Sequence, residues 1–314
     1  MRYILLLAFS LGSLVMQGQQ NPQFGSYAFS GMYYNPALNG LSNRIELLGL
    51  YRMQYAGYQA TTDPQGAPVS QLFSVSSPIF QQKGGIGINV VNDVLGGGRV
   101  GREVTVSGAY HLPVGINKLS LGASVGLFAR GLNGNALRPR DEEDPLLPQT
   151  QVLEMKPDFG LGVAYSGTGF SVGLGVRHLT QPTFALGGLG GENQQRRMYH
   201  LTGQYLLGLS YTWDLQPMAL VRFDGQKITT DVGVLALYDT VFWGGMSYRH
   251  EDAVSALVGI NLLQNKMRVG YVFDYVIAGL AAKSLTSHEL MLQYTLPAPK
   301  PGKRSIVRTP RYSF

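Results

Sequence analysis

Apolar and polar residues alternate with a period of two along most of the chain between residues 44 and 296. In residues 156–166, aspartate, glycine and alanine hold one parity and large apolar residues hold the other: Phe159, Leu161, Val163 and Tyr165. Successive side chains of a β-strand point to opposite faces, so this pattern predicts a strand with one apolar face. On a helix, the same side chains would be scattered around the surface.

Fourteen such stretches are predicted to be strands, with twelve or sixteen strands as alternatives. Most are near the length of about 9–11 residues with which a tilted strand crosses an outer membrane. The predicted strands are residues 43–55, 69–77, 84–94, 101–112, 118–130, 156–166, 169–178, 197–210, 214–223, 227–238, 240–249, 253–263, 266–276 and 286–296. The predicted fold is all-β, a transmembrane antiparallel β-barrel. A soluble β-sandwich would show similar alternation, and the connections discriminate between the two.

The connections between the predicted strands alternate in length along the chain. Those after odd-numbered strands include residues 56–68, 131–155 and 179–196, whereas those after even-numbered strands are mostly tight. Outer-membrane barrels have short periplasmic turns and longer extracellular loops, a segregation that a soluble sandwich does not need. We therefore expect the long loops outside the cell and both ends of the chain in the periplasm. Tyrosines near strand ends are expected at the membrane interfaces: Tyr51, Tyr55, Tyr110, Tyr165, Tyr238, Tyr248 and Tyr294.

Composition favours a single membrane domain. Charged residues make up 14% of the chain, against about 25% in soluble proteins. The 41 glycines and 18 tyrosines suit a barrel with small wall residues and aromatic girdles. After the first twenty residues, no segment is apolar over about 18 residues, which argues against a helical membrane protein. The absence of cysteine excludes disulfides, thiolate metal sites and a lipid-bearing cysteine.

The chain divides into four predicted parts. Residues 1–18, with one positive charge before a short apolar run, are predicted to be a signal peptide that is removed. Residues 19–42 are predicted to be a periplasmic N-terminal segment or a small plug, with a rigid turn at Asn35-Pro36. This turn either seats Phe24 to Phe29 in the periplasmic mouth or only marks the start of the wall. Residues 43–296 form the barrel, and residues 297–314 form a basic tail.

The tail carries much of the formal net charge of +6, through Lys300, Lys303, Arg304, Arg308 and Arg311. It either touches acidic surfaces in the periplasm or stays solvated, and no nucleic-acid partner is expected for an exported protein. Charges of both signs also lie on the parity predicted to face the lumen: Arg52, Asp158, Arg177, Arg222, Asp224, Asp231, Arg249, Arg268 and Asp274. We expect them to pair across the lumen and support a packed interior, with solute selectivity as the alternative.

Motifs that could carry chemistry have simpler explanations. Gly96, Gly98 and Gly101 have dinucleotide-binding spacing, but a strand-like run follows them and no helix N-terminus is available for a pyrophosphate. The acidic run from Asp141 to Asp144 is more typical of a solvated loop than of a divalent-cation site. The five histidines lack metalloprotease spacing and no serine elbow occurs. We therefore expect neither an enzyme nor a cofactor or metal site.

The start of the predicted mature chain carries a resemblance to a known family. Residues 20–24, Gln-Asn-Pro-Gln-Phe, are followed by Tyr27, Phe29 and Tyr33, and then by Asn35, Pro36, Ala37 and Gly40. Together with Arg52-Gln54-Tyr55 and the ending Arg308-Thr309-Pro310-Arg311-Tyr312, this pattern resembles the PorP/SprF family of type IX secretion system membrane proteins from Bacteroidetes. The resemblance extends over the whole chain.

The resemblance implies a non-enzymatic barrel in the cell outer membrane that works with the type IX secretion or gliding motility machinery. It implies partners as well: other secretion components, and a secreted surface protein with a C-terminal sorting domain whose export or retention the barrel assists. Partner contacts are expected in the long outer loops, at Arg138, Arg140, Asp141, Glu142, Glu143, Asp144, Phe184 and Arg196. The alternative function is a transport channel of fatty-acid-porin type for small hydrophobic or polar solutes, with the inward charges lining its path.

Overall fold

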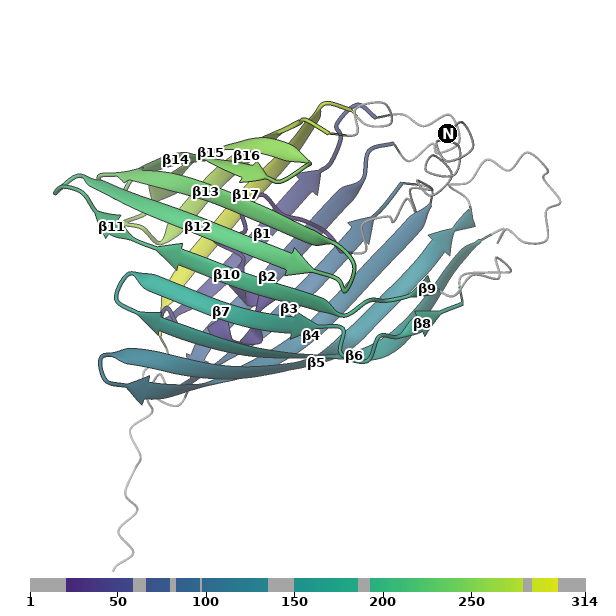
Figure 1. Ribbon diagram of the computed structural model, residues 1–314, viewed down its shortest axis with the longest axis horizontal. Coiled ribbons are helices and arrows are strands. Elements are labelled where there is room, and N and C mark those ends of the chain that lie inside the picture. The colour runs from purple at the N-terminus through teal and green to yellow at the C-terminus, as the bar shows by residue number, and fades with distance from the viewer. Residues whose placement is uncertain are drawn as a thin grey trace, which may run out of the picture.

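Figure 1 shows the computed structural model of the protein, a closed barrel of long tilted strands. The structure describes residues 21–58, 66–79, 83–96, 98–134, 150–185, 193–278 and 284–298. Among these residues, no helix is long and apolar enough to cross a membrane.

Fourteen staves form the barrel wall, and each pairs antiparallel with its neighbours. They are β1 (Arg44–Met53), β2 (Val69–Ile79), β3 (Gly84–Val94), β4 (Arg99–Val114), β5 (Asn117–Asn133), β6 (Gln151–Gly167), β7 (Phe170–Arg177), β10 (Met198–Tyr205) continued by β11 (Leu207–Gly208), β12 (Trp213–Phe223), β13 (Ile228–Tyr238), β14 (Phe242–Arg249), β15 (Ala253–Leu262), β16 (Met267–Val276) and β17 (Thr286–Pro297). Pairing of β1 with β17, and of β10 with both β7 and β12, closes the barrel.

The fourteen predicted strands are confirmed, most of them to within two residues at each end. The largest difference is at β5 and β6, which continue pairing up to Asn133 opposite Gln151. The predicted loop 131–155 is therefore shorter than expected, because the alternation continues through Leu153 and Met155 on the outward face. With 16 or 17 residues each, β4, β5 and β6 exceed the length needed to span a bilayer, so this part of the wall extends beyond it.

The two ends of the barrel differ in their connections. The long-loop end carries the connections after β1, β3, β5, β7, β12, β14 and β16, and the short-turn end carries the tight turns together with the start of β1 and the end of β17. Exposed aromatic side chains mark both levels on the outer face. Near the short-turn end these are Tyr110, Tyr165, Tyr205, Trp213, Tyr238 and Phe242, and near the long-loop end they are Tyr51, Phe223, Tyr248 and Tyr275. Two such girdles are typical of a membrane barrel.

A segment that precedes β1 lies inside the barrel. This lumenal segment, residues 21–43, contains a one-turn helix α2 (Gly31–Tyr34) and a 3₁₀ turn η1 (Pro36–Leu38). Asn21 contacts His178, which follows β7 at the long-loop end, whereas Gly40 lies beside Gly85 at the short-turn end. The segment thus runs the length of the lumen, and Gly40, with φ of 71°, turns the chain towards β1.

Residues Phe24 to Phe29 therefore lie deeper than the sequence predicted. Gly25 and Ser26 donate their backbone N–H groups to Glu289 of β17, over 2.7 and 3.0 Å, one residue level from the long-loop end of the strand pair. Phe29 reaches the opposite end, where its ring packs against Trp243. The prediction that this stretch sits at one mouth did not anticipate that a carboxylate inside the wall would hold its backbone.

One half of the lumen is an apolar core. Inward residues from β12 round through β17 to β3 pack against aromatic side chains of the lumenal segment, among them Phe24, Tyr27, Tyr33 and Tyr34. The wall contributes Leu48, Leu50, Leu72, Val91, Met218, Leu220, Leu235, Trp243, Leu257, Val272 and Met291. Burial of this many large side chains is the main driving force that holds the segment in place.

The other half of the lumen is lined by small residues that allow the backbone of the segment to approach closely. A Cβ on Gly162 would overlap the Asn35 side chain, one on Gly122 would overlap the backbone at Pro36 and Ala37, and one on Gly175 would overlap the Tyr34 carbonyl. This glycine track on β5, β6 and β7 receives residues 34–37. Its inward glycines leave space for another chain segment, which explains why so many small residues occupy that parity.

Ion pairs complete the interior, and they join neighbouring or nearby strands where the sequence predicted pairs across the lumen. Arg177 of β7 donates to Glu103 of β4, two strands beyond β6, over 2.6 Å. Arg52 pairs with Asp274 and Glu289, and Arg222 shares Asp231 with Arg249, whose guanidinium also reaches the less buried Asp252. Apart from Asp252 these side chains are almost completely buried, so each charge depends on its partner for neutralisation. Of the predicted lumenal charges, Asp224 and Arg268 take part in none of the ion pairs among the described residues.

The glycine track leads to a prediction about stability. Gly162→Ala should displace Asn35 and destabilise the folded barrel by about 1–3 kcal/mol, the usual effect of overpacking. A Cβ on Gly203 meets no atom within 4 Å, so Gly203→Ala is the matched control. Loss of the compact band on unboiled denaturing gels with rising temperature measures the effect. Equal melting of the two variants would contradict close packing between Asn35 and β6.

A second prediction concerns the buried ion pair between Arg177 and Glu103. Arg177→Met should destabilise the barrel by roughly 3–5 kcal/mol, because it leaves the Glu103 carboxylate buried without a cation. Adding Glu103→Gln should restore most of the loss. Arg222→Ala should cost less, since Arg249 still neutralises Asp231. The same gel assay ranks the three variants, and a destabilisation by Arg222→Ala as large as that of Arg177→Met would be inconsistent with the observed sharing.

Candidate functional site

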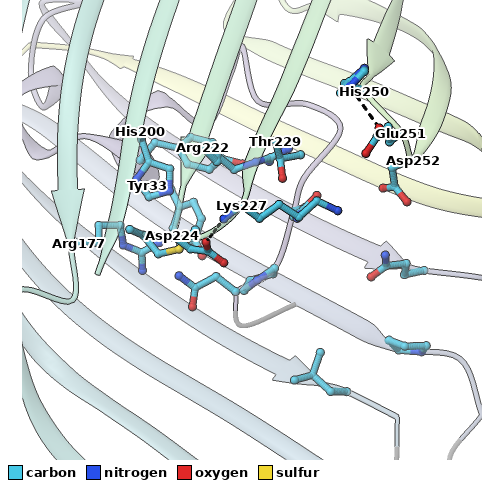
Figure 2. A pocket seen from close by; sticks show the side chains of 18 of the residues that line it. Tyr33, Arg177, His200, Arg222, Asp224, Lys227, Thr229, His250, Glu251 and Asp252 are labelled. Carbon is cyan, nitrogen blue, oxygen red and sulfur yellow. Dashed lines mark hydrogen bonds and ion pairs between the residues drawn. The ribbon is translucent and has the colours of Figure 1, made fainter. Parts of the chain in front are cut away.

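The long-loop end of the lumen opens into a cavity of about 550 Å³, which we call the vestibule. Its floor is formed by the lumenal segment, at residues 21–23 and at Tyr33 and Tyr34. Its wall is formed by strand ends and turns, and Figure 2 shows Arg177, His200, Arg222 and Thr229 gathered on one side and residues 250–252 on the other. The position suits a site that is reached from the side of the long loops.

Two cationic side chains of the vestibule, Arg177 and Arg222, form ion pairs with carboxylates of the barrel wall. Arg177 lies 4.1 Å from the centroid of the Tyr33 ring and pairs with Glu103, which fixes the guanidinium against the floor. The ring of His200 packs on that of Tyr34, with centroids 5.2 Å apart. Arg222 forms a buried ion pair with Asp231 of the adjacent strand β13. The aromatic floor beside these cations makes the vestibule amphipathic, and suited to a ligand with an apolar body and a polar end.

The connection after β7 folds back into the barrel mouth. Its two short strands, β8 (Thr183–Phe184) and β9 (Asn193–Gln194), pair with each other. His178 is fully buried, bonded to Asp158 over 2.8 Å, and its ring packs at a tilt against that of Phe128, with centroids 4.9 Å apart. Phe184 also packs against Phe128, at a centroid distance of 5.8 Å. This loop is therefore part of the barrel packing near the mouth.

The predicted partner-contact residues are placed unevenly. The structure shows Phe184 1% exposed, so in this arrangement it contacts the wall and not an external partner. Arg196 is half-buried and donates to Gln226 in the turn after the neighbouring β12. The acidic run of the preceding loop lies outside the described residues, as do its two neighbouring arginines: Arg138, Arg140, Asp141, Glu142, Glu143 and Asp144.

The residues that carry the family resemblance have structural roles. Asn35 accepts the Ala37 N–H over 2.9 Å, capping η1, and donates to the Val163 carbonyl over 3.0 Å. Pro36 begins η1 and Ala37 lies on the glycine track. The Gly40 N–H donates to Ser76 of β2. Tyr55, predicted at the membrane interface, instead lines the vestibule, because the chain turns inward after β1 with φ of 55° at this residue.

The other candidate motifs do not form a binding or catalytic site among the described residues. Strand β4 follows Gly96 and Gly98, as the sequence predicted. No group of three metal-binding side chains occurs within the part of the chain that the structure describes. His111 and Ser120 are 2.7 Å apart, but both are buried inside the lumen beside Asn39, where they support packing. Sequence reasoning missed the vestibule, because its residues come from strand ends that lie far apart in the sequence.

Solved structures that resemble the protein are outer-membrane barrels. The toluene transporter TbuX of Ralstonia pickettii shares 15% identity over 86% of this chain and 94% of its own, with a TM-score of 0.54. The monoaromatic hydrocarbon channel CymD shares 12% identity over 87% and 93%, with a TM-score of 0.52. At this identity the likeness establishes the fold alone. No curated protein sequence matches the chain.

A family model covers most of the chain. The model of the type IX secretion system membrane protein PorP/SprF matches residues 16–294, which include the lumenal segment and all but the end of the last strand. The match agrees with the resemblance carried by Asn35, Pro36, Ala37 and Gly40. The chain therefore belongs to the PorP/SprF family of type IX secretion system membrane proteins.

Proposed function

We propose that the protein is a non-enzymatic component of the type IX secretion or gliding motility machinery, which helps to export or retain a secreted partner that carries a C-terminal sorting domain. The observation that carries the proposal is the filled lumen. The lumenal segment runs from one end of the barrel to the other, packed against an apolar core on one side and the glycine track on the other. A barrel filled in this way suits a membrane platform better than a conduit.

In this proposal the lumenal segment acts as a plug, the short-turn end faces the periplasm and the long loops face outside. Loops at the outer rim are where binding residues concentrate on a rigid scaffold. Residues 134–150 and 179–196 are the proposed contact region for the secreted partner. The first connects the long strands β5 and β6, which extend beyond the bilayer and would present it to a large partner.

The second candidate function is transport of small hydrophobic or polar solutes. The amphipathic vestibule favours it, with Tyr33 and Tyr34 as an apolar floor beside Arg222 and His200. The similar barrels include a toluene transporter, and a comparable ligand would fit a cavity of about 550 Å³. Passage beyond the vestibule would require the lumenal segment to move.

Orientation provides one test. An epitope tag inserted next to Glu142 should bind antibody on intact cells, whereas a tag after Phe314 should do so only after the outer membrane is permeabilised. The loop-length asymmetry of the strands underlies this expectation. If the tag after Phe314 is labelled on intact cells and the one at Glu142 is not, the proposed topology is inverted.

The partner role provides a second test. Removing residues 138–145 should block surface display of the exported partner or release it into the medium, while the barrel keeps its melting behaviour. Shortening a long loop changes its closure entropy only slightly, so folding should survive. The matched control removes residues 59–64 from the loop after β1. Normal partner display in the first variant, together with reduced uptake of small aromatic solutes when Tyr34→Ala alters the vestibule floor, would replace this proposal with the transport function.

A further inference from the structure

The short-turn end of the lumen opens into a second cavity of about 420 Å³, which we call the basal mouth. Its lining comes from the segment before β1, the first residues of β1, the turn between β15 and β16, and inward positions of β16 and β17. All eight lining residues are polar. Three of them are cationic, Arg44, Lys266 and Arg268, and only Glu46 is acidic. The basal mouth is therefore small, open and predominantly positive.

Arg268 differs from four other inward arginines of the strands, because those four form ion pairs with carboxylates. Arg52, Arg177, Arg222 and Arg249 each lie within 3.3 Å of a carboxylate. None of the ion pairs among the described residues includes Arg268, and the same is true of Arg44 and Lys266. The barrel thus neutralises its deeper arginines and leaves positive charge at this mouth.

The Arg268 guanidinium is held in place by neutral partners. Its Nε donates to the Asn261 side chain over 2.8 Å and its Nη1 donates to Gln293 over 3.4 Å. Its Cζ lies 4.7 Å from the centroid of the Phe29 ring, a cation–π contact with the lumenal segment. Amide and aromatic neighbours orient the group, and Glu46 is the one carboxylate of the cavity whose charge acts on it, against the three cations Arg44, Lys266 and Arg268. A preoriented guanidinium at the wall of an open cavity is suited to bind a carboxylate.

Position narrows the class of ligand. The cavity lies on the inward parity of β1, β16 and β17, so lipid headgroups on the outer face of the wall do not reach it. The lumenal segment packs behind it, with Phe29 on its inner side, so a solute entering from this end meets a closed interior. The ligand class that fits this position is one that binds in the cavity from the short-turn side and does not pass through the barrel.

We propose that the basal mouth binds an acidic segment of a partner polypeptide, with a carboxylate side chain seated between Arg268 and Lys266. The proposal rests on the proposed function, which places this end in the periplasm and in contact with other secretion components. The excess of positive charge on this mouth would attract such a segment. The mouth supplies the defined contact, since its arginine is fixed by Asn261.

Binding can be measured on the purified full-length protein in neutral detergent. A fluorescent peptide of alternating glutamate and glycine should bind, and the same peptide with glutamine should not. Arg268→Gln combined with Lys266→Gln should weaken binding about tenfold, because the interaction is charge-assisted. Arg102→Gln combined with Lys156→Gln removes the same charge at the other end of the barrel and should leave binding within about twofold.

Three results would overturn the proposal. The first is equal affinity of the mouth variant and the control for the glutamate peptide. The second is complete loss of binding when the five tail residues are changed to glutamine, with no effect of the mouth variant, since the tail would then be the sole site. The third is full displacement of the peptide by millimolar inorganic phosphate at constant ionic strength, which would indicate a site for small anions only.

A cellular assay separates this inference from the proposed function. If deletion of the gene leaves export of the secreted partner unchanged, the proposed function itself fails. If deletion stops export but the Arg268→Gln, Lys266→Gln variant restores it fully at normal barrel abundance, the function stands and the basal mouth is not a partner site. The expected result is a stable barrel that restores export poorly, with the control variant restoring it fully.

Discussion

A barrel of fourteen strands encloses more space than its own inward side chains fill, whereas about eight strands is the size at which side chains alone suffice. The rest of this structure depends on how that space is occupied. Residues 21–43 occupy it, and each half of the wall is adapted to them: large apolar residues face the aromatic side chains, and glycines face the backbone at Tyr34 to Ala37. The wall and the segment thus form one core.

Because the centre of the lumen is filled, the barrel has two separate cavities, one at each end, with different linings. The vestibule has an aromatic floor, and two of its arginines, Arg177 and Arg222, are neutralised by Glu103 and Asp231. The described lining of the basal mouth includes no aromatic residue. Its cationic side chains Arg44, Lys266 and Arg268 take part in none of the ion pairs among the described residues. Because Phe24, Tyr33 and Tyr34 lie between the two, each end can bind its own ligand without a shared path.

Much of the wall was predictable because period two is a direct consequence of strand geometry. The strand number and the inward side of charges such as Arg177 follow from it, although its partner Glu103 was not among the charges predicted to face the lumen. The contents of the lumen were not predictable in the same way. Parity assigns Leu48 and Gly162 to the inner face, but does not show that one meets an aromatic cluster and the other a backbone. Likewise, a loop phenylalanine such as Phe184 gives no local signal that it packs inward on Phe128.

The residues that carry the family resemblance help to locate specificity. Asn35 caps η1 and binds the wall at Val163, Pro36 fixes the turn, and Gly40 provides the left-handed bend into β1. These three residues hold the lumenal segment in the barrel, whereas other residues of the resemblance, among them Asn21, Tyr33 and Tyr55, line the vestibule. In this chain the Asn35-Pro36-Ala37 element therefore fixes a filled barrel, and the proposed partner contacts are assigned to other residues, at the loop rim and around Arg268.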